Sequence, residues 1–466
     1  MSHEQAIVPT RTSPNKHATM PRSLDRTLGF TDLLFIVIGT VIGSGIFIVP
    51  ATVLRQTGGA LGPAMLVWFV AGILSLLGAL TYGEMGAAKP DAGGLYSYIR
   101  DAFGPLPAFL YGWTTFFVIG AGSVATLAVA FTSYLRQLIP VSPGAGKVVA
   151  VLLIALIAAL NVRGTRQSAG VQNVSTGIKA IAIIVMSIAL IVAGGAPVST
   201  ASMWPAEMTT GLLSGIGQAM IGVLWAYEGW HMVTFSTGEA RDAQRTFPRA
   251  IIAGTGFLIG LYMIANVGYV AALGVEGVQA TDRVAPSAVA ASFGPSAGKL
   301  IAVVILVSMF SAANGLTLTA PRMYYAMARD GLIFRKLGEV HPRFGTPAFA
   351  IIAGSTWAAV LAATGTFEQL LTYVVFTGWI FYGLGALSIF VFRRREPDAP
   401  RPFRVPGYPL TPILFVLASS AIVLNTLVTQ PSRALVGIAG VLSGVPVYLL
   451  WRRRAAGRPT VAPDEA

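Results

Sequence analysis

The chain has 466 residues, of which 54% are hydrophobic and only 11% are charged. A soluble fold of this size could not bury that much apolar surface, so most of it must face lipid. The sequence has no cysteine, which excludes disulfides, thiolate chemistry and thiolate metal sites. The net charge of +13 could indicate a nucleic-acid partner. That interpretation depends on where the basic residues lie relative to the apolar stretches.

Long apolar stretches follow one another along the chain. A helix needs about 20 apolar residues to cross a hydrocarbon core of about 30 Å. Twelve such stretches are separated by short polar segments, and they cover residues 29–54, 62–86, 102–136, 146–162, 169–194, 210–239, 248–274, 297–328, 347–365, 368–392, 408–429 and 433–452. The sequence therefore predicts an all-α polytopic membrane protein with twelve transmembrane helices.

The basic residues are distributed unevenly between the two sides of these spans. If the amino terminus is cytoplasmic, 25 of the 32 Lys and Arg lie in the two tails and the five alternate loops of that side. This asymmetry follows the positive-inside rule and accounts for the charge without a nucleic acid. We therefore expect a multi-pass protein of the cell membrane, embedded in the lipid bilayer, with both termini in the cytoplasm.

The first and the sixth predicted spans contain glycine-centred interruptions. These are Gly43-Ser44-Gly45-Ile46-Phe47 and Ala226-Tyr227-Glu228-Gly229-Trp230. Each interruption opens a set of five spans, which indicates a five-plus-five repeat, and an odd number of spans makes the second copy inverted. Broken helices at corresponding positions of two inverted halves point to a substrate site near the middle of the membrane.

At the first interruption, the amides of Gly43, Ser44, Gly45 and Ile46 would begin the outer half-helix. The positive end of a helix dipole favours a substrate carboxylate at this position. The alternative is helix packing, because Gly39 and Gly43 have the small-xxx-small spacing of closely packed membrane helices. A dinucleotide-binding loop is excluded, since no strand precedes these glycines.

Two charged residues lie inside apolar spans. Glu228 needs an amine, a proton or a cation as its partner, or else it is a protonated and hydrogen-bonded spacer. Lys179 could donate to the free carbonyls of the interrupted first span and so take the place of a bound ion. It lies too far inside its span to reach an interface by snorkelling.

Other polar and aromatic residues are weaker candidates. Trp225, Tyr227 and Trp230 at the sixth-span break either cap a substrate or pack, and His231 has no second ligand at helical spacing that would make a metal site. No catalytic, cofactor or metal motif appears elsewhere, so we do not expect an enzyme. Candidate lining residues from other spans are Ser123, Asn314 and Trp379, although mid-span polar residues often bond only a neighbouring helix.

Several stretches share motifs with a known family: Val41-Ile42-Gly43-Ser44-Gly45-Ile46-Phe47, Glu84-Met85-Gly86 through Gly93-Gly94-Leu95-Tyr96-Ser97-Tyr98, residues 225–251, Asn314-Gly315 through Ala328-Arg329-Asp330-Gly331, and His341-Pro342 to Thr346-Pro347. On these stretches the chain resembles the amino acid-polyamine-organocation (APC) superfamily. Within it, the chain is similar to the bacterial type of the L-type amino acid transporter (LAT) branch. The resemblance runs nearly from end to end.

The resemblance implies the LeuT-type fold of two inverted five-helix repeats plus two extra helices, working by alternating access. The repeats would cover residues 28–200 and 201–395, and the extra helices 396–454, between a disordered cytoplasmic tail at 1–27 and another tail at 455–466. The resemblance also assigns roles: the substrate carboxylate to the backbone of Gly43, Ser44 and Gly45; the amine to carbonyls of Trp225, Ala226 and Glu228; an aromatic gate to Trp225; and a stand-in for sodium to Lys179.

The chain also departs from the family pattern. Many L-type relatives have Gly or Asp where this chain has Glu228, so both neutral and cationic amino acids remain as substrates. Eukaryotic members are linked to a glycoprotein heavy chain through a cysteine, which is absent here. Because the resemblance makes Lys179 the stand-in for sodium, we expect a sodium-independent amino acid exchanger or facilitator. The alternatives are a proton-coupled amino acid or polyamine symporter in which Glu228 titrates, and a non-transporting membrane sensor or scaffold.

Overall fold

The computed structural model describes residues 26–91, 93–136, 138–196, 203–205, 207 and 209–456, so both predicted tails lie almost wholly outside it. Within these residues the regular structure is helical, apart from one isolated backbone bridge between Leu28 and Ala240. The prediction of an all-α polytopic membrane protein is confirmed.

Nine helical segments of the described chain are long and apolar enough to cross a membrane: α3 (Leu61–Ala88), α5 to α6 (Pro105–Leu135), α7 (Pro143–Arg163), α8 (Thr165–Ala193), α10 (Ala243–Gln279), α12 (Pro295–Arg329), α14 (Phe367–Arg395), α15 (Leu410–Thr429) and α16 to α17 (Pro431–Arg452). A tenth candidate is a pair bent by 42°, α1 (Phe30–Val41) and α2 (Gly45–Gln56). The shorter elements are α4 (Leu95–Phe103), α9 (Thr210–Ala226), η3 (Trp230–Glu239), α11 (Val284–Phe293), η4 (Arg335–Gly338) and α13 (Ala348–Thr364).

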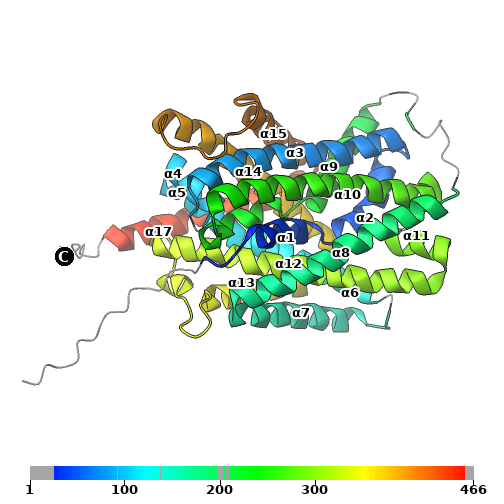
Figure 1. The fold of residues 1–466 in the computed structure, drawn as a ribbon, viewed down its shortest axis with the longest axis horizontal. Coiled ribbons are helices and arrows are strands. Elements are labelled where there is room, and N and C mark those ends of the chain that lie inside the picture. Colours follow the sequence, from blue (N-terminus) through cyan, green and yellow to red (C-terminus); the bar gives the residue numbers. More distant parts are fainter. Residues whose placement is uncertain are drawn as a thin grey trace, which may run out of the picture.

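Most long helices run along the long axis of the molecule (Figure 1). At one end lie α4 and the end of α17, which we call the α4 end, and at the other lie α11 and the start of α9. Large apolar side chains face outward on the peripheral helices, for example Leu152 on α7, Val185 on α8 and Leu417 on α15, each at least 60% exposed. Such a surface is stable only against hydrocarbon.

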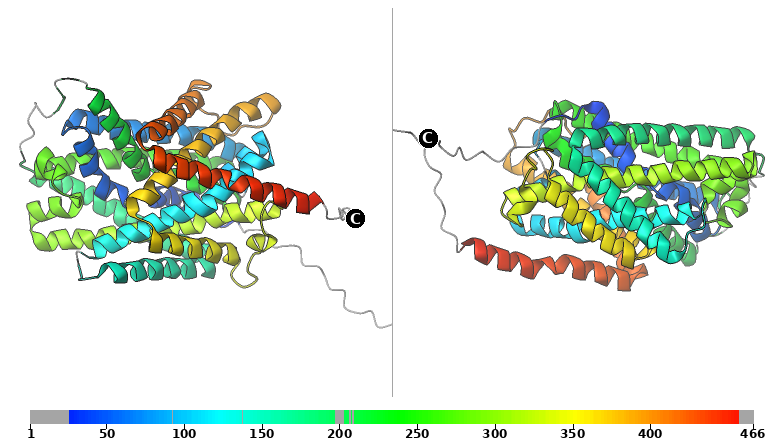
Figure 2. Two further views of the ribbon diagram at one scale, coloured as in Figure 1. Left: turned by 180° about the vertical axis from the view of Figure 1, so that it is seen from behind. Right: turned by 90° about the horizontal axis from the view of Figure 1, so that it is seen from below.

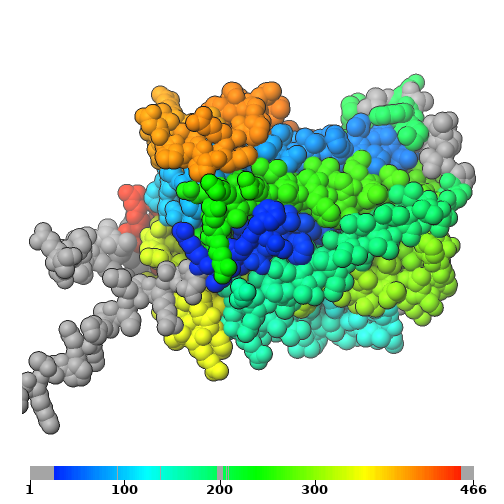
Figure 3. Space-filling model, in the orientation of Figure 1, coloured from blue at the N-terminus to red at the C-terminus, as the bar shows by residue number. Residues whose placement is uncertain are grey.

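The bent pair lies between longer helices. α1 packs against α8 and α10, and Figure 3 shows its dark blue surface bordered by these two helices. Residues 36–47 are all buried, although Thr40 and Ser44 among them are polar. The last helix lies at the edge of the bundle, as the two views of Figure 2 show. The centre of the fold is therefore built around α1 and not around the carboxyl-terminal helices.

A buried ion pair closes the bundle at the α4 end. Arg322 Nε of α12 donates to Glu239 Oε2 at 2.8 Å, and both side chains are at most 2% exposed. The same guanidinium donates to Thr165 Oγ1 at 2.7 Å at the start of α8. The Glu239 carbonyl accepts from the amide of Leu28 at 2.9 Å, so the entry to α1, the end of η3, α8 and α12 are held together.

The short polar segment after the second predicted span forms α4, which lies across the α4 end. Tyr96 OH donates to Asp330 Oδ2 at 2.7 Å, and Arg100 forms an ion pair with the same carboxylate. Arg395 Nη1 donates to the carbonyls of Asp101 and Ala102, both at 3.2 Å. This helix therefore ties the ends of α12 and α14 to each other.

Candidate functional site

The α1–α2 break leaves backbone carbonyls without helical partners. α1 ends at Val41, and Ile42 leaves the helical region with φ −70° and ψ 87°. α2 then begins at Gly45, where the first amides of a helix have no partner within it. In hydrocarbon, unpaired groups of this kind cost several kcal/mol each, so the protein must supply their partners itself.

Lys179 supplies the main donor to these carbonyls. Its side chain leaves α8 fully buried, and Nζ lies 2.6 Å from the carbonyl oxygens of both Gly39 and Ile42. A third carbonyl, that of Ser308 on α12, is 3.4 Å away. The hydroxyl of Ser308 in turn donates to Ile42 O at 3.0 Å. One ammonium group thus joins α1, α8 and α12 at the break.

The second break, between α9 and η3, is joined to the first. α9 ends at Ala226, and Gly229 has a φ of 113°, in the left-handed region that favours glycine. The hydroxyl of Tyr262 on α10 lies 3.0 Å from Ala226 O and 3.2 Å from Val41 O and donates toward both. Thr40 Oγ1 lies 3.0 Å from Gly229 O. Single side chains therefore span both interrupted helices.

The two breaks cross with almost no space between their backbones. A Cβ atom on Gly45 would lie 2.4 Å from Ala226 Cα. A Cβ atom on Gly229 would lie 3.0 Å from Thr40 O, so each break presses a glycine against the other chain segment. Any larger side chain at Gly45 must move backbone atoms of α9.

A small cavity of about 20 Å³ lies at this crossing. Six predicted site residues line it, namely Gly43, Ser44, Gly45, Ser123, Trp225 and Glu228, together with Thr40, Val41, Leu127 and Leu316. A water molecule needs about 10–15 Å³ of such space, so an amino acid does not fit without movement. The structure therefore represents a closed state of this site.

Trp225 covers one side of the cavity. It is 5% exposed, and its Nε1 lies 3.4 Å from Ser44 Oγ of the other break. Its ring meets that of Phe367, from the start of α14, edge to face at 6.3 Å between centroids. Phe367 begins α14, and the other end of that helix bonds α4 through Arg395, so this ring contact lies toward the end of the bundle opposite α4.

Glu228 also lines the cavity. Its carboxylate accepts a hydrogen bond from Tyr382 OH of α14 at 2.6 Å, and His231 Nδ1 lies 3.9 Å from the same oxygen. His231 is fully buried, and neither ring nitrogen has a hydrogen-bond partner among the described residues. The Ser123 hydroxyl is likewise unpartnered there. The wall thus offers an acidic group and the hydroxyl of Ser123, while His231 lies behind Glu228 and does not line the cavity.

The remaining predicted residues lie around the cavity or away from it. Ile46, Ala226, Tyr227 and Gly229 belong to the crossing but do not line the cavity. Asn314 instead bonds Asn161 on α7 at 2.9 Å and Gln172 on α8 at 3.1 Å, and Trp379 packs on Phe415 and Tyr382. No group of three or more His, Asp or Glu among the described residues is placed to hold a metal ion.

Sequence reasoning missed Ser308 and Tyr262, which bind the breaks, and four lining residues: Thr40, Val41, Leu127 and Leu316. The only sequence signal for Ser308 and Tyr262 is that each is a hydroxyl in the middle of a span. This signal is weak, because many mid-span hydroxyls in this chain donate to their own helix, as Thr126 does.

Comparison with known proteins points to amino acid transport. The amino acid permease family matches residues 28–442. The b(0,+)-type amino acid transporter 1 of Homo sapiens is 33% identical over 441 residues, which are 92% of this chain and 88% of that protein. The serine/threonine exchanger SteT of Bacillus subtilis is 32% identical over 94% of this chain and 99% of its own length. The large neutral amino acids transporter small subunit 2 of Mus musculus is 32% identical over 92% of this chain and 81% of its own length.

Replacing Gly45 with valine should abolish uptake while leaving the protein inserted, because the new side chain overlaps the α9 backbone at the crossing. Labelled amino acid uptake into proteoliposomes measures the effect. Gly260→Val is the matched control, since nothing lies within 4 Å of a Cβ atom there, and it should transport like wild type. Undiminished uptake by Gly45→Val would rule out the proposed carboxylate site.

Replacing Lys179 with alanine should lower transport about tenfold or more, because buried carbonyls that lose a donor cost about 1–3 kcal/mol or more. It should also change the ratio of the substrate affinities on the two sides. Lys147→Ala, at an exposed lysine of α7, is the control. Wild-type kinetics in Lys179→Ala would contradict the role of the ammonium.

Proposed function

Because this chain belongs to the amino acid permease family and is a multi-pass membrane transporter of amino acids, we propose that it works by alternating access as a sodium-independent exchanger or facilitator. The observation that carries this proposal is the contact of Lys179 with the carbonyls of Gly39 and Ile42. A carbonyl cluster in a broken helix is a natural cation site. Here a cation of the protein already satisfies it, so no external sodium is required.

The arrangement of the breaks supports two inverted repeats. α1 packs against η3 and α2 against α9, so the two broken spans run in opposite directions past each other. Counting the α9–η3 pair and α13 as spans, beside the nine long segments and the bent pair, gives the twelve predicted helices. We accordingly propose five spans in each of residues 28–200 and 201–395, and two more in 396–454.

The charge distribution supports a cytoplasmic location for the α4 end. Arg393, Arg394 and Arg395 lie in the last turn of α14, and Arg329 ends α12 at the same end. Positive residues favour the cytoplasmic side of the cell membrane. On this assignment both termini are cytoplasmic, and the Trp225–Phe367 contact faces the outside as the gate.

Substrate binding is proposed at the two half-helix ends. The carboxylate would meet the amides at the start of α2, from Ser44 to Ile46, where the helix dipole is positive. The amine would meet carbonyls at the end of α9 and in the break that follows it, at Trp225, Ala226 and Glu228. Closure of Trp225 over the bound molecule would complete the outward gate.

The acidic wall of the cavity bears on the choice of substrate. Glu228 is held by Tyr382, and the neighbouring Ser123 hydroxyl is unpartnered among the described residues. A side chain that donates hydrogen bonds or carries positive charge would find partners there, so we propose that polar and cationic amino acids are accepted.

Exchange is favoured over facilitation because one relative is a serine/threonine exchanger. A disulfide-linked heavy chain is not expected without a cysteine.

Glu228 also supports a second function, proton-coupled symport. An acidic side chain buried in a span is a candidate proton carrier, and Glu228 lies beside a second titratable residue, His231, at 3.9 Å. In this mechanism the carboxylate would exchange a proton with the solution instead of meeting the substrate.

Uptake of labelled amino acids into proteoliposomes separates the two functions. In sodium-free buffer at equal internal and external pH, we expect uptake when unlabelled amino acid is present inside. Gly45→Val proteoliposomes give the background. Uptake that appears only with an imposed pH gradient would overturn the exchanger and assign coupling to Glu228, and a strict requirement for sodium would contradict the role of Lys179.

Replacing Glu228 with glutamine should shift preference from cationic toward neutral amino acids, because the site loses its negative charge and keeps its shape. Loss of one charge-assisted bond corresponds to about tenfold in the ratio of kcat/KM values. Glu368→Gln is the control, at an exposed carboxylate in the first turn of α14. An unchanged substrate profile would identify Glu228 as a hydrogen-bonded spacer.

A further inference from the structure

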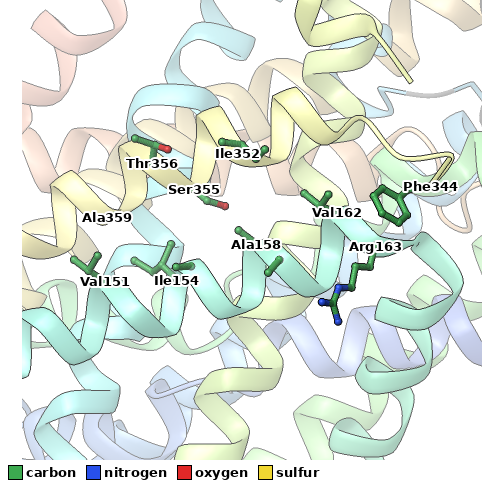
Figure 4. A pocket seen from close by; sticks show the side chains of 12 residues that line it. Val151, Ile154, Ala158, Val162, Arg163, Phe344, Ile352, Ser355, Thr356 and Ala359 are labelled. Carbon is green, nitrogen blue, oxygen red and sulfur yellow. The ribbon is translucent and has the colours of Figure 1, made fainter. Parts of the chain in front are cut away.

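A groove of about 630 Å³ lies between α7 and α13, away from the central cavity (Figure 4). α7 belongs to the first proposed repeat and α13 to the second. The groove has the size of ligand pockets in proteins, which hold about 300–1,000 Å³. Nothing in the proposed transport cycle uses it.

Small residues on both helices create this groove. Ala155, Ala158 and Ala159 of α7 face Ser355 and Ala359 of α13, so the helices pack together but leave a channel along the contact. Nine of the twelve lining residues are apolar, and none is acidic. A channel with these walls suits a hydrocarbon chain.

The groove is as long as one leaflet of a membrane is deep. Its α7 wall runs from Val151 to Val162, and at 1.5 Å per residue this is about 16 Å. Half of a hydrocarbon core of about 30 Å is about 15 Å. The groove ends at the last turn of α7, on the side of the membrane that we assign to the cytoplasm.

A positive charge stands at that end. Arg163 is exposed and is the single ionisable residue among those that line the groove. Its side chain has no ion pair or hydrogen bond within the described residues. In Figure 4, Arg163 and Phe344 lie at the same end of the groove, and the guanidinium is directed away from the Phe344 ring. Phe344 lies in the loop before α13. The hydroxyl of Thr346 in the same loop donates to Val162 O at 2.8 Å and so attaches this loop to the end of α7.

A polar side chain also faces the channel. Ser355 is 9% exposed, and its hydroxyl has no hydrogen-bond partner in the described part of the chain. It lies seven residues after the start of α13, which is about 10 Å along the helix. Ser355 therefore lies deeper in the membrane than Arg163. If the phosphate of a lipid is beside Arg163, the ester groups of that lipid lie at the deeper level, near Ser355.

We propose that the groove binds an acyl chain of an anionic phospholipid of the cytoplasmic leaflet, with the phosphate on Arg163 and an ester oxygen within reach of Ser355. The apolar walls, the length of about one leaflet and the exposed arginine at one end favour this occupant over a transmembrane helix. An extended acyl chain has an anionic headgroup at one end only and no backbone that needs hydrogen-bond partners.

Native mass spectrometry of the full-length protein in detergent tests this site, with added phosphatidylglycerol compared with phosphatidylcholine of the same acyl chains. We expect one phosphatidylglycerol to bind about fivefold more tightly, the effect of one basic residue at an anionic surface. Arg163→Gln should remove this preference without changing phosphatidylcholine binding. Ala159→Phe, or Ala155→Phe if the first variant is not monodisperse, should weaken both lipids by filling the channel.

Two matched variants serve as controls. Arg249→Gln removes an exposed arginine of α10, and Ala421→Phe adds a ring to the exposed face of α15; both should bind lipid like wild type. Equal affinity for the two lipids, or an unchanged preference in Arg163→Gln, would overturn the headgroup site. Lipid binding unaffected by Ala159→Phe and Ala155→Phe would overturn the groove. A dimer that these variants dissociate would assign the groove to a second copy of the chain instead.

Discussion

The ammonium of Lys179 bonds two backbone carbonyls that the break in the first span leaves free, and the rest of the site depends on this contact. Hydrocarbon offers no hydrogen-bond partner, so a helix can be interrupted in the membrane only where the protein supplies one. Ser308 and Tyr262 complete the set of donors from α12 and α10. The break is thus a property of four packed helices and not of the glycines alone.

The crossing of the two breaks would let the proposed site be both general and selective. Backbone atoms meet so closely at Gly45 and Ala226 that side chains are excluded from the contact. In the proposed binding mode, the groups common to all amino acids would be left to backbone amides and carbonyls, which do not vary with sequence. Discrimination would then fall to the few side chains that line the cavity, of which Glu228 is the only ionisable one.

The fold was largely predictable because long apolar runs, glycine-centred breaks and a buried charge leave clear patterns in a sequence. Lys179 could be connected with the first break because an isolated ammonium in an apolar span must find acceptors. Asn314 is a predicted lining residue, and in this structure its side chain bonds Asn161 and Gln172, because a mid-span polar residue does not reveal which neighbour its face meets. Tyr262 went unnoticed for the same reason. The rotation of each helix depends on packing against several others, which local patterns do not encode.

The buried pair of Arg322 and Glu239 gives the α4 end a seal with unusual energetics. Two charges lose their water when they are buried, and this loss offsets much of their attraction. When the seal opens, both charges regain their hydration free energy. Separating an apolar contact of similar size regains no such energy and costs about 25 cal/mol for each Å² of apolar surface that water reaches. Opening at this end therefore takes up water. On the proposed alternating-access cycle and orientation, we therefore expect the balance between the closed and inward-open forms to depend on water activity at this end of the bundle, and solutes that withdraw water to favour the closed form.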